Sequence, residues 1–250
     1  MKHEKTSRSS TLKNTLQLLK LFSAEQPEWG ISQLARELGL AKSTVHRMLT
    51  TLVSTGFVIK NPETHRYHLS ARLLHLGHTV ISQHPVYHQA KPFLHKLVRQ
   101  TGETAHLSIL KGVEVIYLYK VECQHPVRLP SYVGLTNPAF CTASGQAILA
   151  YHPEKVEQVL TQGLTAYTPH TPATREALMG KLAKVREEGV AISIEELEEG
   201  VYSIAAPIWD PNQNKVIAAI SIAGPTQRLT AEKLPVLVSY VKQAAKLSGT

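Results

Sequence analysis

The chain has 250 residues and a hydrophobic content of 43%, which is enough for one large or two ordinary globular domains. Its formal net charge is +8, and the first 70 residues carry 10 Lys/Arg against 5 Asp/Glu, a basic excess that favours a polyanionic partner. The sequence has no run of about 18 apolar residues and no apolar signal core, which excludes a helical membrane protein and predicts a cytoplasmic one. Two cysteines, Cys123 and Cys141, are too few for a disulfide framework.

Three helices are predicted between residues 10 and 56. The first begins at Ser10 and has apolar residues at helical spacing, namely Leu12, Leu16, Leu18, Leu19 and Phe22. After a turn at residues 25–30, the second helix places four apolar residues on one face: Ile31, Leu34, Ala35 and Leu38. Gly39 ends this helix, because the residue just past a helix end often has a positive φ, which costs glycine no strain.

The residue pattern of the third helix predicts a DNA-binding surface. Its apolar positions are Val45, Met48, Leu49 and Leu52, and they leave the opposite face polar, rich in hydrogen-bond donors and free of acids. Two helices joined by such a short turn form a helix-turn-helix, whose second helix enters the major groove of DNA. We predict DNA contacts by five residues of this face: Lys42, Ser43, Thr44, His46 and Arg47. The alternative is a helical hairpin with a solvated basic face in an unrelated α-helical domain.

A wing is predicted directly after these helices. Residues 57–60 and 67–69 have the pattern of two short strands, and the turn-rich segment 61–66 joins them. His65 and Arg66 fall near the tip of this hairpin. Contact with phosphates or the minor groove is predicted for both, and a plain solvated loop is an equally open alternative. Three helices followed by a basic hairpin are the parts of a winged helix-turn-helix.

A linker helix is predicted at residues 71–84, and it could pair with its copy in a dimer. Beyond it, residues 85–250 mix helical and strand patterns, whereas residues 123–138 carry three prolines and have an irregular pattern. The helices are expected at 86–100, 142–150, 153–161, 174–188 and 230–247, and the strands at 103–110, 113–121, 190–195, 201–209 and 215–223. Strands bounded by helices at both ends predict an α+β domain with an antiparallel sheet.

Several short motifs occur in an order and at spacings that are specific only when taken together. They are GLAKSTVHR at 39–47, YHL at 67–69, GET at 102–104, CTASG at 141–145, GVYSIAAP at 200–207 and AAISIAGP at 218–225. On these residues the sequence resembles the IclR family of bacterial transcriptional regulators over nearly its whole length.

The resemblance implies a regulator built from three segments. Residues 1–70 would form the winged helix-turn-helix DNA-binding domain and residues 71–84 the linker helix. Residues 85–250 would form a profilin-like or GAF-like effector-binding and oligomerisation domain. Family members generally bind operators as homodimers or as dimers of dimers. Many repress genes for the catabolism of small organic acids, sugar acids or aromatic acids, and others activate genes.

The resemblance also implies an effector pocket between the sheet and the helix at 142–150. Ala143 and Ser144 would offer backbone N–H groups, Ser203 and Ser221 hydroxyls, and Leu129 an apolar wall. Ser193 and Ser203 stand where many members have Asp and Cys, and neither adds negative charge. Similarly, Ala223 replaces a frequent Ser and Gln146 a frequent Lys. A helix N-terminus favours a carboxylate, so we expect a small anionic effector. The alternative is that these residues form only a helix cap and a serine-containing core.

Other functions remain open at this point. An enzyme could use Cys141 near His125, or Ser144, as its nucleophile, but nothing in the sequence places a base and an orienting acid around either. A metal site formed by Cys123, His125 and Cys141 would lack the paired spacing of a structural zinc site. A DNA-binding protein without an effector is a third alternative. We expect a regulator that is not an enzyme and holds no metal or cofactor.

Overall fold

The computed structural model describes residues 10–23, 25–126 and 129–249. Within them the chain forms two compact units, of which the first ends at Val80 and the second begins at Ile81. Helix α4 (Arg72–Ser82) carries the chain across this boundary. No helix of the described residues is long and apolar enough to cross a membrane.

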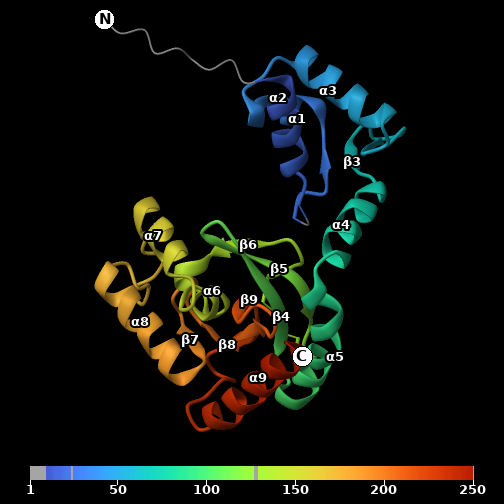
Figure 1. The fold of residues 1–250 in the computed structure, drawn as a ribbon. Helices are drawn as coiled ribbons and strands as arrows, with labels where there is room; N and C mark the ends of the chain where they lie inside the picture. The colour runs from blue at the N-terminus through green and yellow to red at the C-terminus, as the bar shows by residue number, and fades with distance from the viewer. Residues whose placement is uncertain (1–9, 24, 127–128, 250) are drawn as a thin grey trace, which may run out of the picture. The chain divides into compact units, whose positions relative to one another are not determined.

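The first unit is a winged helix-turn-helix (Figure 1). Its helices are α1 (Thr11–Lys20), α2 (Ile31–Leu38) and α3 (Lys42–Ser54). A three-stranded antiparallel sheet, in the order β1-β3-β2, consists of β1 (Glu28–Trp29), β2 (Val58–Lys60) and β3 (Tyr67–Leu69). The turn predicted at 25–30 is therefore wrong in part, because Glu28 and Trp29 pair with His68 and Tyr67. Two residues are too few for strand periodicity to show in a sequence.

The core of this unit consists of residues from all three helices, including Leu18, Leu34, Val45 and Leu49, which are fully buried. Helix α1 was predicted correctly, but it has two apolar faces. Leu18 and Phe22 lie in the core, whereas Leu12 and Leu16 are 69% and 53% exposed. Helical spacing groups residues by face, but it does not say which of two apolar faces is buried.

The second unit is built on a six-stranded antiparallel sheet in the order β6-β5-β4-β9-β8-β7. Its strands are β4 (Thr104–Lys111), β5 (Glu114–Val121), β6 (Thr136–Pro138), β7 (Ala191–Ile194), β8 (Val201–Asp210) and β9 (Lys215–Pro225). Strand β6 lies at the edge, inside the stretch that was predicted to be irregular. The antiparallel α+β fold itself is confirmed.

Helices cover both faces of this sheet (Figure 1). Helices α5 (Pro85–Thr101) and α9 (Leu234–Ser248) pack on one face. The other face carries the short 3-10 helix η1 (Ala139–Cys141) and helices α6 (Ala143–Leu149), α7 (Pro153–Gln162) and α8 (Arg175–Glu188). In β8, Ile204 and Ile208 face α5 and α9, while Ala205 faces α6. Since side chains alternate along a strand, Ser203 lies on the α6 face as well.

Helix α6 approaches its neighbours very closely. All seven of its residues are buried, and a Cβ atom on Gly145 would lie 2.1 Å from the carbonyl oxygen of Ala139. Only glycine fits at this position, because any side chain would overlap the backbone of η1. The close approach places the start of α6 against the sheet, beside the serines of β8 and β9.

Candidate functional site

The first candidate surface lies at the start of α3. Gly39 has φ of +64°, and the N–H of Leu40 donates to the carbonyl oxygen of Ala35 at 3.0 Å, so the chain turns sharply between the two helices. Four of the predicted contact residues are exposed and the fifth, Thr44, is half-buried. The N-cap residue, Ala41, provides no side-chain hydrogen bond. The start of α3 is thus an exposed, acid-free set of donors at a helix N-terminus, which attracts phosphate.

The wing has an ordered tip. The side-chain oxygen of Asn61 accepts hydrogen bonds from the N–H groups of Glu63 at 2.9 Å and Thr64 at 3.1 Å, and this turn presents an exposed His65 with φ of +55°. Asparagine commonly forms such turns with its own following backbone.

Arg66 lies where the wing meets the rest of the domain. Its Nη2 donates to the carbonyl oxygen of Glu28 at 2.9 Å and to Oε1 of Gln33 at 3.2 Å, and its Nε lies 3.8 Å from the Glu28 carboxylate. Contact between Arg66 and DNA stays a prediction. The guanidinium also links the start of β3 to β1 and α2, because partners 33 and 38 residues away come within reach of its donors.

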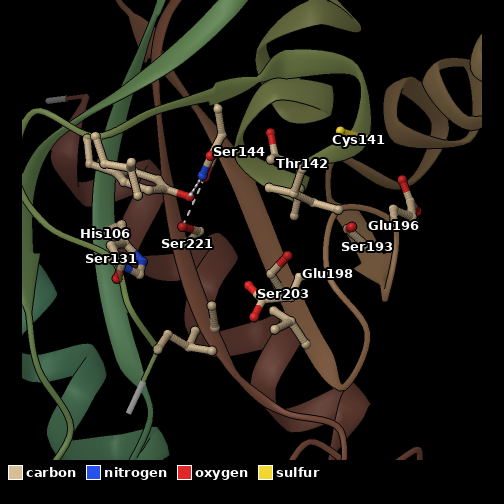
Figure 2. Close-up of a pocket in the computed structure, with 18 of the residues that line it drawn as sticks. His106, Ser131, Cys141, Thr142, Ser144, Ser193, Glu196, Glu198, Ser203 and Ser221 are labelled. Carbon is tan, nitrogen blue, oxygen red and sulfur yellow. Dashed lines mark hydrogen bonds between the residues drawn. The ribbon is translucent and has the colours of Figure 1, made fainter. Parts of the chain in front are cut away.

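The second candidate site is a cavity of about 220 Å³ in the second unit, between the sheet and α6 (Figure 2). All six residues predicted for the effector pocket line it: Leu129, Ala143, Ser144, Ser193, Ser203 and Ser221. Strand register brings the serines together. Ser203 of β8 pairs with Ser193 of β7, and Ser221 of β9 pairs with His106 of β4.

Hydrogen bonds fix the wall of the cavity at the start of α6. The hydroxyl of Thr142 accepts from the N–H of Gly145 at 3.2 Å and so caps the helix. The hydroxyl of Ser144 donates to that of Ser221 at 3.0 Å, as the dashed line in Figure 2 shows. The helix cap and the serine-containing core, which were the alternative to an effector pocket, are therefore both present. The same residues also line the cavity, so a structural role and a binding role are compatible.

His106 lines the cavity but was missed from the sequence. Its Nε2 lies 2.8 Å from the hydroxyl of Ser131, and its ring stacks on that of Tyr117 with centroids 4.6 Å apart. Burial, with a smaller contribution from Lys120, lowers the pKa of His106 to about 3. The ring is therefore neutral at physiological pH. Alternation along β4 could have placed His106 on a sheet face, but not in this cavity.

Two acids in the cavity wall were also missed. Glu196 is 1% exposed. Its carboxylate accepts a hydrogen bond from Nε2 of Gln146 at 2.5 Å and another from the ammonium of Lys181. Burial raises the pKa of Glu196, although both partners oppose the shift. Glu198 is exposed and lines the same cavity.

The candidate nucleophiles lack the surroundings that catalysis needs. Burial and the nearby Glu196 raise the pKa of the Cys141 thiol to about 12, so the reactive thiolate is strongly disfavoured. Ser144 is bonded to another serine rather than to a base. Within the described parts of the chain, no group of three or more His, Cys, Asp or Glu residues could hold a metal ion.

Each of the two units matches the model of a known domain family. The model of the IclR helix-turn-helix domain matches residues 11–62, and that of the bacterial transcriptional regulator IclR C-terminal domain matches residues 78–248. The chain is 37% identical to the HTH-type transcriptional regulator XynR of Escherichia coli over 236 residues, which are 94% of this chain and 93% of XynR. It is 35% identical to KdgR of E. coli, with 92% and 89% of the two chains covered.

A solved structure matches over the same length. It is an IclR homolog from Microbacterium hydrocarbonoxydans complexed with 4-hydroxybenzoate, with a TM-score of 0.84 and 25% sequence identity over 96% of this chain and 98% of that one. The fold, the two family models and the relatives agree with one another. The chain therefore belongs to the IclR family of bacterial transcriptional regulators.

Proposed function

We propose that this protein is a repressor that binds operator DNA through α3 and the wing and is controlled by a small carboxylate bound in the cavity beneath α6. The observation that carries the proposal is the pairing of an acid-free reading face with a hydroxyl-lined cavity in one chain. In this assignment residues 1–70 bind DNA, residues 71–84 form the linker, and residues 85–250 bind the effector. Since bacterial operators lie in the cytoplasm, the protein acts there.

In this proposal the five predicted contact residues of α3 divide between base contacts and phosphate contacts. Arg47 is long and planar enough to contact a guanine through two hydrogen bonds in the major groove. Ser43, Thr44 and His46 bond neighbouring bases or phosphates, and Lys42 at the helix start contacts a phosphate. His65 contacts the backbone from the wing tip. Arg66 acts indirectly, since its bonds to Glu28 and Gln33 hold the wing in place.

The cavity suits a carboxylate at the start of α6. Thr142 already caps Gly145, so the N–H groups of Ala143 and Ser144 are the next donors at a wall that both residues line. The hydroxyl of Ser221, which accepts from that of Ser144, keeps its own proton and adds a further donor there. The structure of an IclR homolog complexed with 4-hydroxybenzoate, which is a small carboxylate, supports this assignment.

Apolar residues on the first unit support a homodimer. Helix α4 has no buried residue, and its Leu74 is 74% exposed. A groove beside α1 is lined by the exposed Leu12 and Leu16 together with Leu69 and Leu73. Since exposed apolar patches of this kind are typical of protein interfaces, we assign this face to contact with a second copy of the chain. Two copies would present two recognition helices to the two halves of an operator.

Control by the effector requires that the two DNA-binding domains of the dimer can adopt two different arrangements. A ligand shifts their equilibrium only if it binds one arrangement more tightly than the other. The effector is proposed to act through the linker helix, which changes the spacing of the recognition helices.

The test is footprinting of the full chain on DNA next to its own gene, followed by measurement of operator affinity with and without a panel of small carboxylates. A protected site whose affinity changes with one acid, together with higher reporter expression in a deletion strain, is expected. Absence of sequence-specific protection would reject DNA-binding regulation. An affinity that no ligand changes would reject effector control.

A further inference from the structure

A groove on the second unit lies at the end of β8, away from the cavity beneath α6. Strand β7 pairs with β8 only up to Ala205, so among the described strands β8 has a free edge on that side from Ala206 onward. The end of α9 lies against this edge, because a Cβ atom on Gly249 would be 2.3 Å from the carbonyl oxygen of Trp209. The groove runs between α9 and the end of β8 and shares no lining residue with the cavity beneath α6. It is therefore a separate feature of the fold.

Two aromatic rings form the apolar part of the groove. The indole of Trp209 and the ring of Tyr151 meet edge to face, with centroids 4.8 Å apart and an interplanar angle of 69°, so each ring holds the other in place. A register shift between Ile208 and Trp209 marks a β-bulge at this point, and bulges redirect side chains, often beside functional sites. Trp209 remains 38% exposed, so part of its indole is available to a planar ring. Pro207 and Pro211 extend the apolar lining.

One face of α9 supplies the polar wall of the groove. Four residues of this face line it: Ser239, Lys242, Gln243 and Lys246. Their spacing of three, four and seven positions places them on one side of the helix, and the described lining residues include no Asp or Glu. The ammonium of Lys242 donates to the carbonyl oxygen of Glu188 at 2.9 Å, and that of Lys246 has no hydrogen bond or ion pair with a described residue. Two like charges four positions apart on a helix repel each other, so both would stabilise an anion placed between them.

We propose that this groove is a second ligand site, which binds a small planar aromatic anion. The ring of the ligand stacks on the exposed part of the Trp209 indole, since offset stacking is a favoured arrangement of aromatic rings. Its anionic group lies between the ammonium groups of Lys242 and Lys246. The hydroxyl of Ser239 and the amide of Gln243 are further donors. The two lysines disfavour the alternative, an aromatic cage for a cation, because like charges repel. The site goes beyond the proposed function, which does not depend on this groove.

The test is fluorine NMR of the full chain labelled with 5-fluorotryptophan. The chain has two tryptophans, and Trp29→Phe assigns their signals. The probes are 2-naphthoate, 2-naphthamide with the same rings and no charge, and decahydro-2-naphthoate with the charge and no aromatic ring. The Trp209 signal is expected to shift saturably with 2-naphthoate, which should bind about fivefold more tightly than either other probe, while the Trp29 signal stays in place. Absence of a saturable shift at Trp209, or equal affinity for 2-naphthamide, would overturn the proposal.

Variants of α9 and β8 show whether the probe lies in this groove. Lys246→Gln removes an exposed charge, so the chain should still fold and the affinity for 2-naphthoate should fall about threefold. Lys233→Gln removes an equal charge at the other end of α9, outside the groove, and should leave the affinity unchanged. In equilibrium dialysis, Trp209→Leu should bind one molecule of 2-naphthoate fewer per chain than Trp29→Phe. Equal effects of the two lysine variants would reject the site and leave DNA binding and effector control intact.

Discussion

Replacement of Lys181 by methionine tests the buried acid in the cavity wall. Glu196 is 1% exposed, and Lys181, whose side chain is 41% exposed, donates to its carboxylate. Removing one partner of a buried ion pair costs about 3–5 kcal/mol. Water reaches Lys181 and Gln146 keeps its bond to Glu196, so we expect a smaller loss of about 2 kcal/mol. For a protein of this size, that loss lowers Tm by about 4–8 °C.

The loss should depend on pH in a defined direction. Burial raises the pKa of Glu196 in the folded state, and removal of the Lys181 ammonium raises it further. In acid, near the pKa of an unfolded glutamate at about 4.3, Glu196 is neutral in the folded variant. The variant therefore loses little stability relative to the unmodified protein. As the pH rises toward the folded pKa, the unfolded chain ionises first and the variant loses stability. The destabilisation is therefore largest at neutral pH.

The assay is urea unfolding at neutral and at acidic pH, with Lys181→Met/Glu196→Gln as the matched control. The double variant removes the buried charge and should recover most of the stability at neutral pH. A stability loss that is equal at both pH values, or that the second substitution does not reduce, would show that the Lys181–Glu196 contact does not offset a buried charge.

Four further variants test the two candidate sites and the proposed dimer. Arg47→Ala should weaken operator binding by about 1–3 kcal/mol and relax the base preference, whereas Lys42→Ala should mainly lower the salt dependence, by about 0.9 in the log–log slope; titrations at several salt concentrations would measure both. Gly145→Ala should destabilise the second unit by about 1–3 kcal/mol in urea unfolding, because its Cβ would meet the Ala139 carbonyl. Leu12→Glu combined with Leu16→Glu should shift sedimentation toward the monomer, because both side chains are exposed and charge opposes burial in an interface.

The controls use features of the same elements. For α3, Thr50→Ala changes an exposed residue whose hydroxyl bonds its own helix at His46, and it should leave base preference unchanged. For the dimer, the contrast is Leu18→Glu on the same helix, which should unfold the first unit because Leu18 is fully buried. The variant at Leu12 and Leu16 should instead keep the circular dichroism spectrum of the unmodified protein. Equal effects of Arg47→Ala on all operator sequences would reject its role in base reading, and an unchanged oligomer would reject the assigned interface.

Local patterns in the sequence were sufficient for much of this structure. Helical spacing and Gly39 predicted α2, the turn and α3, because these features depend on neighbours a few residues apart. The strand pattern of residues 201–209 and 215–223 predicted β8 and β9. Family motifs also identified six residues that line one cavity.

Tertiary structure alone decided which distant residues meet. Alternation along a strand assigns a side chain to a face, but the strand order β4-β9-β8 is what sets His106 beside Ser221, 115 residues later in the chain. Tertiary packing also decided that Arg66 donates to Glu28 and Gln33. It likewise decided which apolar face of α1 remains exposed. Glu196 and Glu198 lie in a loop without periodicity, so their place in the cavity wall could not be predicted. The sequence by itself thus determined the family and the elements other than the short strands β1 and β6, whereas contacts between elements, which depend on packing across the whole chain, decided the chemistry of the cavity.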